Sequence, residues 1–355
     1  MKQVLFITGS RADWGKMVTL ATAVHGEPDF HARVFVTGTH LQVAYGHTAN
    51  DITAVLEQVK MPNQAASPDL VLAKTLQSLS AIDRPDLVVI HGDRMEALAG
   101  AIYGLARALP VAHIEGGERS GSMDEATRHA VSKLATHHFV ANDEAAEVVA
   151  AMGEDRARIK VIGSPDLDVM LNRPPLDLRG LIPFAPRDYG VLCYHPVTTL
   201  TTEELNRRAL EVAAAADLSG QNWVVITPNN DPGHYRIEVA LRQLTGPRFY
   251  VQRHLQFEGF LAVLRNAKFM LGNSSAGVRE APAFGVPSIN VGSRQRGRYE
   301  CPGIADVPED RQAILDALKN PPQAEPDNHF GEGQAALKFM EALASQTFWE
   351  IPVQK

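Results

Sequence analysis

The chain has 355 residues, of which 45% are hydrophobic and 21% charged, a balance typical of a globular protein with roughly two domains. Its formal net charge of −7 shows no basic excess, so a nucleic-acid partner is not expected. An anionic small molecule stays open, because local arginines bind phosphate whatever the net charge, and no apolar run approaches the ~20 residues that span a membrane.

The start of the chain and its cysteines indicate a reducing environment. The first apolar stretch, residues 4–8, is too short for a signal sequence, and a glycine-containing turn follows it instead of a cleavage site. Cys193 and Cys301 lie far apart, and neither has a Cys or His nearby in metal-ligand spacing. We therefore expect a cytoplasmic protein without a disulfide framework.

Short apolar runs alternate with helical patterns through the first half of the chain. Because the apolar runs are continuous and lie between helices, they indicate a parallel sheet that is covered on both faces. The predicted strands are residues 4–8, 33–38, 86–93, 110–117, 137–143 and 159–165. The predicted helices are residues 16–24, 95–109 and 120–137, the last with Ser122 and Glu125 as a capping box at its start.

A Pro-rich stretch at residues 171–188 lacks periodicity and is interpreted as a linker, after which the alternation restarts. The domains are therefore predicted as residues 1–170 and 189–334, with a final helix in residues 335–355. The second half is predicted to hold strands at residues 189–196, 222–231, 249–253, 269–275 and 287–297. Its helices are predicted at residues 202–216, 234–244, 257–267 and 276–285.

Ligands bind at the carboxyl ends of strands in open α/β sheets, and the residues that follow the strands here are unusually polar. TGSRADWGK (residues 8–16) lacks the dinucleotide pattern; it is either an ordinary turn with Asp13 as a cap or a loop that places Arg11 over a phosphate. Asp93, at the end of the predicted strand 86–93, is either a helix cap or an acid.

A third segment, residues 113–129, carries the densest group of ionisable side chains. The simpler interpretation is a helix whose first turns are stabilised by ion pairs, since Asp124 and Arg128 are i,i+4 neighbours. So many carboxylates close together would also push one pKa upward, which suits acid–base chemistry. The ionisable residues of this segment include Glu115, Glu118, Asp124, Glu125, Arg128 and His129.

In the second half, His195 follows a strand and is either a core histidine or a site residue. Turn chemistry alone explains the polar segment at residues 227–233. GNSSAGVRE, which begins at Gly272, predicts a helix N-terminus with two hydroxyls, an arrangement that binds anions, followed by a basic loop able to close over a diphosphate. A capped helix followed by a solvated loop is the alternative. The basic residues of that loop are Arg294, Arg296 and Arg298.

Together these segments resemble the hydrolysing UDP-N-acetylglucosamine 2-epimerases, a family that supplies N-acetylmannosamine or a related sugar for sialic and legionaminic (nonulosonic) acid synthesis. The resemblance covers nearly the whole chain, and its most specific blocks are HIEGGE (residues 113–118) and GNSSAGVREAPAFGVPSINVGSRQRGR (residues 272–298). It implies a GT-B type fold, in which two Rossmann-like domains face each other across a cleft and the C-terminal helix packs back on the first domain.

The resemblance also implies roles for individual residues. It places Asp93, Glu115, Asp124 and His195 at catalytic or sugar-contacting positions. It implies that the substrate, a UDP-sugar, is bound without cofactor or metal, and that the protein is a homodimer or homotetramer. The implied substrate-binding residues are Arg11, Ser274, Ser275 and Arg298 at the diphosphate, Glu280 at the ribose, His254 near the uracil, and Arg94, Arg128, His40 and Asn229 around the substrate.

The family reaction eliminates the nucleoside diphosphate to give a 2-acetamidoglucal and then adds water. Several alternatives stay open. A non-hydrolysing epimerase would keep UDP on the product, and a related hydrolysing enzyme would act on a 2,4-diacetamido sugar linked to UDP or GDP. A GT-B glycosyltransferase would need an acceptor, and a regulator would bind UDP without turnover; the acid cluster argues against both.

Overall fold

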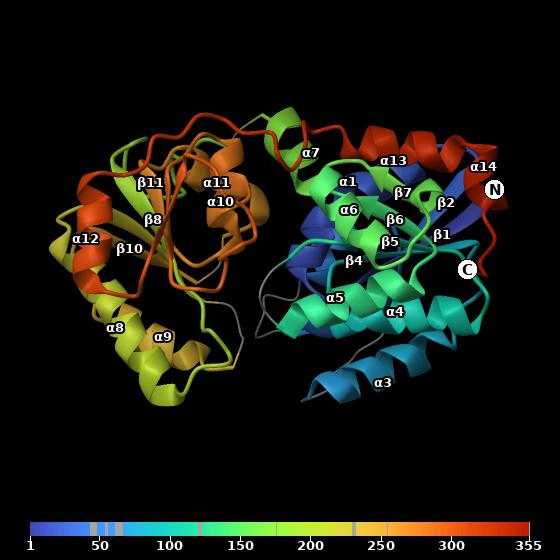
Figure 1. The fold of residues 1–355 in the computed structure, drawn as a ribbon, viewed down its shortest axis with the longest axis horizontal. Coiled ribbons are helices and arrows are strands. Elements are labelled where there is room, and N and C mark those ends of the chain that lie inside the picture. The colour runs from blue at the N-terminus through green and yellow to red at the C-terminus, as the bar shows by residue number, and fades with distance from the viewer. Residues whose placement is uncertain are drawn as a thin grey trace. The chain divides into compact units, whose positions relative to one another are not determined.

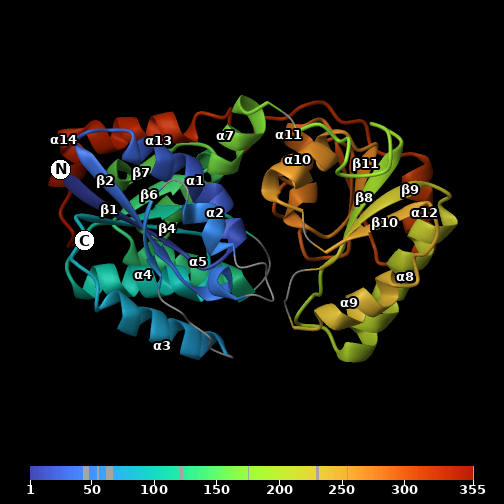
Figure 2. The ribbon, with the colours of Figure 1, turned by 180° about the vertical axis from the view of Figure 1, so that it is seen from behind.

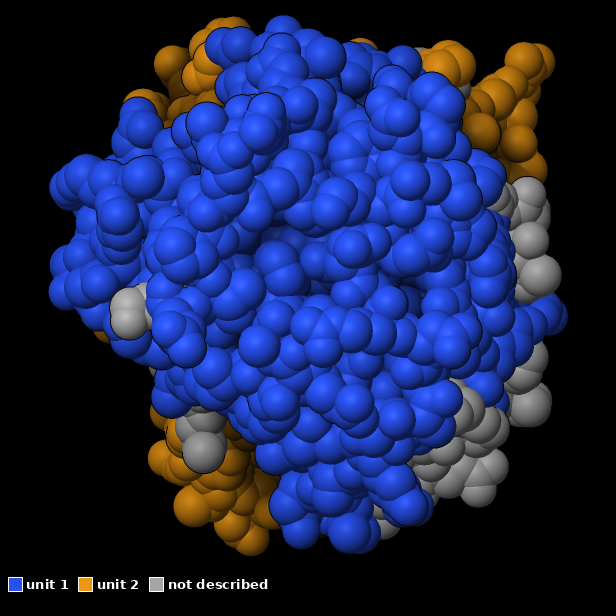
Figure 3. All heavy atoms as spheres, turned by 90° about the vertical axis from the view of Figure 1, so that its right-hand side faces the viewer, with its two compact units in different colours: residues 1–173, 330–355 blue, residues 174–329 orange. Residues whose placement is uncertain are grey.

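The computed structural model describes residues 1–42, 48–53, 56–60, 67–119, 123–174, 176–228, 232–253 and 255–354. They form two compact units (Figures 1 and 2). Unit 1 contains Met1–Arg173 and Phe330–Lys355, and unit 2 contains Pro174–His329, as the colours of Figure 3 show. Within the described part of the chain, no helix has both the length and the apolar character needed to cross a membrane.

Unit 1 is built on a seven-stranded parallel sheet with the order β3-β2-β1-β4-β5-β6-β7. Every pairing between neighbouring strands in it is parallel, as the continuous apolar runs predict. The strands are β1 (Lys2–Thr8), β2 (Phe30–Val36), β3 (Glu57–Lys60), β4 (Leu87–His91), β5 (Val111–Ile114), β6 (His137–Val140) and β7 (Ile159–Val161).

Helices cover both faces of this sheet (Figure 1). α1, α7 and α13 pack together on one face, and α3, α4 and α5 pack on the other. The helices of unit 1 are α1 (Arg11–His25), α2 (Ala49–Thr53), α3 (Pro68–Leu79), α4 (Met95–Ala106), α5 (Met123–Leu134), α6 (Asp143–Ala151), α7 (Pro165–Asn172), α13 (Ala335–Ala344) and α14 (Gln346–Glu350).

The side chains of β1 point alternately to the two faces of the sheet and are buried in two different hydrophobic clusters. Val4 and Phe6 are buried in the cluster that contains α1 and α13, whereas Leu5 and Ile7 are buried in the cluster that contains α4. Successive side chains of a strand point to opposite faces, so a strand that is apolar at every position needs a helix layer on each side.

Unit 2 repeats this design on a six-stranded parallel sheet with the order β10-β9-β8-β11-β12-β13. Its strands are β8 (Tyr189–Cys193), β9 (Asn222–Ile226), β10 (Phe249–Gln252), β11 (Phe269–Gly272), β12 (Ser288–Val291) and β13 (Ile304–Val307). Its helices are α8 (Thr202–Leu218), α9 (His234–Leu241), α10 (Phe257–Arg265), α11 (Glu280–Ala283) and α12 (Arg311–Lys319).

The chain passes between the units twice. The stretch predicted as a linker is divided, because α7 ends within it and Leu178 and Ile182 are buried in the core of unit 2. The chain re-enters unit 1 at Phe330, ahead of α13, which packs on α1 and α7. The predicted return of the C-terminal helix to the first domain is therefore confirmed.

The prediction of one continuous helix over residues 276–285 is wrong. A single 3-10 turn, Ser275–Gly277, comes first, and the short α11 begins only at Glu280. Pro282 supplies the reason: inside one continuous helix its ring would clash with the carbonyl of Val278, whereas in the first turn of a new helix it is tolerated. The structure also contains elements that were not predicted, namely the strands β3 and β13 and the helices α2, α3, α6, α7 and α12.

In both sheets the strand order reverses beside the first strand, between β1 and β4 in unit 1 and between β8 and β11 in unit 2. Connections leave such a point toward opposite faces, which opens a crevice at the carboxyl ends of the two strands. The residues after these strands are therefore the first place to look for a site in each unit.

Candidate active site

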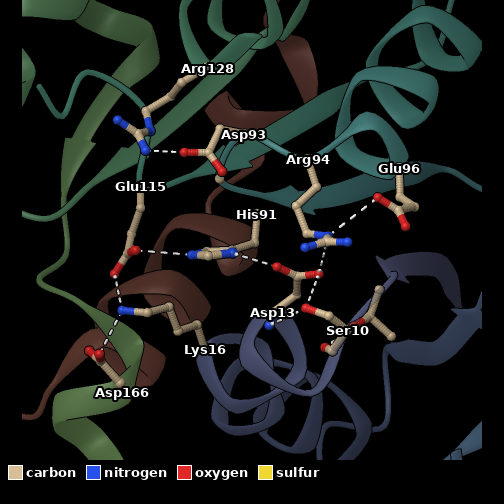
Figure 4. A network of polar contacts seen from close by, with 12 residues as sticks. Ser10, Asp13, Lys16, His91, Asp93, Arg94, Glu96, Glu115, Arg128 and Asp166 are labelled. Carbon is tan, nitrogen blue, oxygen red and sulfur yellow. Dashed lines mark hydrogen bonds and ion pairs between the residues drawn. The ribbon is translucent and has the colours of Figure 1, made fainter. Parts of the chain in front are cut away.

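In unit 1, charged side chains from four separate segments meet at the carboxyl ends of the strands (Figure 4). α1 contributes Asp13 and Lys16, the end of β4 contributes His91, the residue after β5 is Glu115, and the start of α7 contributes Asp166. The five alternate in sign along a chain of contacts, so each ion faces partners of opposite charge.

Glu115 lies at the centre of this network. Its backbone is in the left-handed region, with a φ of 60°, which a non-glycine residue adopts only when the surrounding structure imposes it, and such strain clusters at functional sites. Its buried carboxylate accepts from His91 Nε2 at 2.9 Å and from Lys16 Nζ at 3.3 Å. A close contact with the Ser164 hydroxyl completes its surroundings.

Lys16 joins Glu115 to a second buried carboxylate. Its ammonium group donates to Asp166 at 2.6 Å, and the side chain is only 18% exposed. Ser164, the N-cap residue of α7, also closely contacts Asp166, and its single proton serves one carboxylate at a time. Pro165 follows as the first helical residue, where its missing N–H is not needed, and fixes the path that brings Asp166 inward.

His91 connects Glu115 to Asp13. Its Nδ1 lies 3.7 Å from the Asp13 carboxylate, which is an ion-pair distance and too long for a hydrogen bond. Burial alone would lower the pKa of His91, but the contacts with the Asp13 and Glu115 carboxylates outweigh burial and raise it to about 9. The ring is therefore an imidazolium at neutral pH.

Asp13 is held from two other directions. The Ser10 hydroxyl donates to it at 2.8 Å, and Arg94 lies 3.6 Å away while also pairing with Glu96. Burial would raise the pKa of Asp13, but His91, Arg94 and Ser10 together lower it. The predicted role of Asp13 as the helix cap is wrong, because Ser10 is the N-cap of α1 and its hydroxyl accepts from the Asp13 backbone N–H at 3.3 Å. Arg94, which was predicted to contact substrate, is engaged by the Asp13 and Glu96 carboxylates.

Asp93 and Arg128 form a second close pair in the same unit. Arg128 also donates to the carbonyl of Glu118 at 2.8 Å, so the buried guanidinium ties the loop after β5 to the loop after β4. Asp124 lies exposed in the first turn of α5. The predicted capping residue Ser122 lies outside the described residues.

His40 and Arg11 were predicted to contact substrate. Arg11 is the first residue of α1 and is partly exposed. His40 is fully buried, its two ring nitrogens contact Thr8 at 2.9 Å and Thr48 at 2.8 Å, and burial lowers its pKa to about 4. His40 is thus a neutral residue whose two ring nitrogens are both engaged by threonine hydroxyls.

In unit 2, His195 is positioned by neutral hydrogen bonds. Asn273, directly after β11, accepts from the His195 backbone N–H at 2.6 Å and donates to its carbonyl at 2.9 Å. The His195 ring lies 3.4 Å from the sulfur of Cys193, whose pKa burial raises to about 11, so the thiol is uncharged at neutral pH. Gly272 has a φ of 137°, and a side chain there would collide with the Cys193 carbonyl.

The other predicted residues of unit 2 surround the same strand end. Ser274 caps the 3-10 turn that starts at Ser275, and Glu280 is buried as the first residue of α11. The turn is too short for the long helix N-terminus that the sequence predicted. Arg298 donates to Gln295 at 3.2 Å, and Asn229 and His254 lie outside the described residues.

The basic loop after β12 is tied to the end of β11. Arg294 and Gln295 each donate to the Asn273 carbonyl at 3.2 Å. Asn273 therefore fixes His195 through its side chain and the basic loop through its backbone. Among the described residues, no group of His, Cys, Asp or Glu is arranged to hold a metal ion.

Sequence reasoning missed Lys16, His91 and Asp166. All three stand within polar strand-end segments, TGSRADWGK, HGDR and IGSPD, but nothing in their spacing indicates that they meet. The available signal was their position at or beyond the carboxyl ends of β1, β4 and β7, which the parallel sheet brings to one edge.

The fold and the strand-end residues define a two-domain α/β protein of the GT-B-like class with an ionisable cluster in one unit. A family model described as UDP-N-acetylglucosamine 2-epimerase matches residues 22–344. The chain is 39% identical to the UDP-N-acetylglucosamine 2-epimerase of Neisseria meningitidis serogroup B, with 100% of this chain and 98% of that protein covered. It belongs to the UDP-N-acetylglucosamine 2-epimerase family of enzymes.

Two further likenesses agree. The chain is 33% identical to the UDP-N,N'-diacetylbacillosamine 2-epimerase (hydrolyzing) of Legionella pneumophila, with 97% of this chain and 96% of that protein covered. A crystal structure of UDP-GlcNAc 2-epimerase from Neisseria meningitidis bound to UDP-GlcNAc matches with a TM-score of 0.81 and 18% identity, covering 96% of this chain and 99% of that one. The structural likeness shows the shared fold.

Proposed function

We propose that this chain is a hydrolysing 2-epimerase. It converts UDP-N-acetylglucosamine, or a close 2-acetamido sugar nucleotide, and water into UDP and N-acetylmannosamine or its analogue. The observation that carries the proposal is Glu115, a buried carboxylate on a strained backbone that contacts both Lys16 and His91. The relationship to the Legionella protein, whose name specifies a hydrolysing reaction, supports the hydrolytic form.

The first stage is an elimination. A carboxylate takes the C2 proton, the C–H electron pair forms the C1=C2 double bond, and the C1–O bond breaks so that UDP leaves. We assign this proton chemistry to unit 1, with Glu115, Asp93 and Asp124 as its candidate acids and bases. In the second stage water adds its oxygen to C1 and gives up one proton to a carboxylate, while C2 takes a proton on the face opposite to the one from which the first proton was removed.

The leaving diphosphate needs stabilisation because the C2 proton is weakly acidic. We assign that role to hydroxyls and cations at the phosphate, which stabilise charge as it develops. His195, held by its backbone, is assigned to the leaving phosphate, and Glu280 to the ribose. The assigned diphosphate contacts are Ser274, Ser275, Arg298 and Arg11.

The test is proton and phosphorus NMR of the purified protein with UDP-N-acetylglucosamine in D2O, without added metal. Free UDP together with N-acetylmannosamine that carries deuterium at C2 is the expected result. A product that keeps UDP assigns the chain to the non-hydrolysing reaction. Free UDP with unlabelled N-acetylglucosamine means simple hydrolysis and contradicts the elimination.

A 2,4-diacetamido sugar nucleotide is the second candidate substrate. The observation that favours it is the 33% identity to the Legionella protein, whose name gives such a sugar. The same NMR experiment with the UDP-linked and the GDP-linked 2,4-diacetamido sugar separates the candidates, because the true substrate shows the larger kcat/KM.

A further inference from the structure

One histidine in unit 1, His91, differs in charge from two buried histidines of the same unit, His40 and His113. Burial lowers the pKa of His40 to about 4 and that of His113 to about 3, so both are neutral. His91 is only slightly more exposed, with 11% of its side chain accessible, but it lies between two carboxylates. Its partners, and not its depth in the protein, make it a cation.

We propose that His91 is a positioning residue, whose positive charge ties the Glu115 carboxylate to Asp13 and so holds Glu115 in the orientation that its proton chemistry requires. This inference rests on the proposed function. To the proposed function it adds His91, which need not touch the substrate. It also adds Asp13, which anchors His91 from a different element than the one that carries Glu115.

Glu115 needs such a support because its side chain has several rotatable bonds. Its Oε2 is fixed by His91 at 2.9 Å and its Oε1 by Lys16 at 3.3 Å, so each oxygen has its own cation. Asp13 cannot shift readily, since Ser10 and Arg94 hold it in turn. A base that is fixed before the substrate arrives loses less entropy on the way to the transition state.

The contacts also set a pH dependence. His91 is surrounded by charged or titratable groups from α1, the start of α4, the end of β5 and the start of α7. As the pH rises through a pKa of about 9, His91 loses its proton and the support of Glu115 weakens, so activity falls on the alkaline side. The groups around it are Asp13, Lys16, Arg94, Glu96, His113, Glu115 and Asp166.

The test uses two variants and a matched control. Asp13→Asn removes one carboxylate beside His91 and keeps the shape, so the alkaline limb of the kcat profile is expected to move down by about 1 pH unit or more. His91→Gln keeps an N–H toward Glu115 but carries no charge. Its kcat is expected to fall at least about tenfold with little change in KM, and the alkaline limb is expected to disappear.

The control is His31→Gln. His31 also contacts a glutamate through Nε2, Glu57 at 2.8 Å, but this pair is exposed at the β2–β3 end of the sheet. His31→Gln is expected to keep the wild-type profile. Circular dichroism and thermal unfolding of each variant establish that it is folded before its kinetics are compared.

A second readout does not need turnover. Titration of the histidine ring signals by ¹H–¹⁵N NMR, with His91 identified as the signal lost in His91→Gln, is expected to show a pKa of about 9 that falls in Asp13→Asn. A His91 that titrates near its ordinary value overturns the inference. So does an alkaline limb at the same pH in both variants and wild type, which would mean a purely structural role.

Failure of the proposed function looks different. If the wild-type protein neither releases UDP nor exchanges the C2 proton while His91 titrates as expected, the reaction is wrongly assigned and the charge of His91 stands. If the wild-type protein turns over and His91 titrates normally, the reaction stands and the inference is wrong.

Discussion

Two histidines follow or end strands at corresponding edges of the two sheets, and their surroundings differ completely. His91, at the end of β4 in unit 1, lies between Asp13 and Glu115, whereas His195, after β8 in unit 2, is held through its backbone by Asn273 and lies against an uncharged thiol. The fold places each of them at the carboxyl end of a strand next to the point where the strand order reverses. The charge of each is decided by side chains that come from other segments.

The two strand-end regions as a whole also differ in the kind of polar group that they contain. Unit 1 gathers ions that compensate one another, an arrangement in which removal of one partner leaves an uncompensated buried charge. Unit 2 uses amide, hydroxyl and backbone groups around Asn273, with arginines on the adjoining loop. We therefore expect variants of unit 1 to change turnover and variants of unit 2 to change nucleotide affinity or the position of His195.

The largest expected effect is that of Glu115→Gln. The amide cannot take a proton from C2, so UDP release is expected to fall by about 10²–10⁴-fold, while affinity for UDP stays close to that of wild type. Steady-state release of UDP and calorimetric titration with UDP measure the two quantities. Glu57→Gln is the control, because Glu57 also bonds a histidine but at the surface. Wild-type turnover in Glu115→Gln would contradict the assignment of the proton chemistry to unit 1.

Asn273→Ala is expected to have the next largest effect. It removes both bonds to the His195 backbone, at a position that is fully buried, and each unsatisfied group costs about 1–3 kcal/mol. The kcat is expected to fall about 10–100-fold and the melting temperature to drop. Asn273→Asp keeps the acceptor and should be intermediate, and Asn222→Ala, which loses only its two exposed bonds to Asp188, serves as the control. If Asn273→Ala, Asn273→Asp and Asn222→Ala show equal kinetics, Asn273 does not position His195 for the reaction.

Arg298→Gln tests the nucleotide side. Loss of a charged donor is expected to weaken UDP binding about tenfold, with a smaller change in kcat than Glu115→Gln causes. Calorimetry at two salt concentrations measures the loss, which should shrink as salt screens the wild-type interaction. Arg179→Gln, at a side chain that is 92% exposed in the same unit, is the control. An unchanged dissociation constant would remove Arg298 from the diphosphate contacts.

The smallest expected effect concerns the return of the chain to unit 1. Asp168 accepts from the backbone N–H groups of Ala335 and Ala336 at 2.8 and 2.7 Å, and thus caps α13. Asp168→Ala is expected to lower the free energy of unfolding by about 1–2 kcal/mol, and Asp168→Asn by less. Asp310→Ala, which removes a single exposed cap bond on α12, is the comparison in unit 2.

The cap also carries a pH dependence. Burial raises the pKa of Asp168 more than the two N–H groups lower it, so the folded state holds the proton more tightly than the unfolded state. Relative to Asp168→Asn, the wild-type protein should therefore gain stability as the pH falls through the folded pKa, and lose it as the pH rises. Urea unfolding at a series of pH values measures the difference. A difference that stays constant with pH would contradict the raised pKa.

Much of the fold follows from local patterns. The continuous apolar strands of residues 4–8 and 86–93 predict a parallel sheet, because only a strand buried on both faces needs an apolar residue at every position. The predicted helix at residues 276–285 fails for an equally local reason, since Pro282 is tolerated only in the first turn of a helix and α11 therefore begins at Glu280. The helix α3 was missed because it lies between the predicted strands 33–38 and 86–93, in a stretch for which no motif or cap was recognised.

The sequence by itself determined the fold class, the family and the strand-end segments that carry Glu115, Asp93 and His195, because these depend on short-range periodicity and on contiguous motifs. Only the tertiary structure decided which ions pair. Lys16 and Asp166 are separated by 150 residues, and no local pattern records their contact at 2.6 Å. The charge of His91 has the same origin: burial would make it neutral, and two carboxylates from distant elements make it a cation.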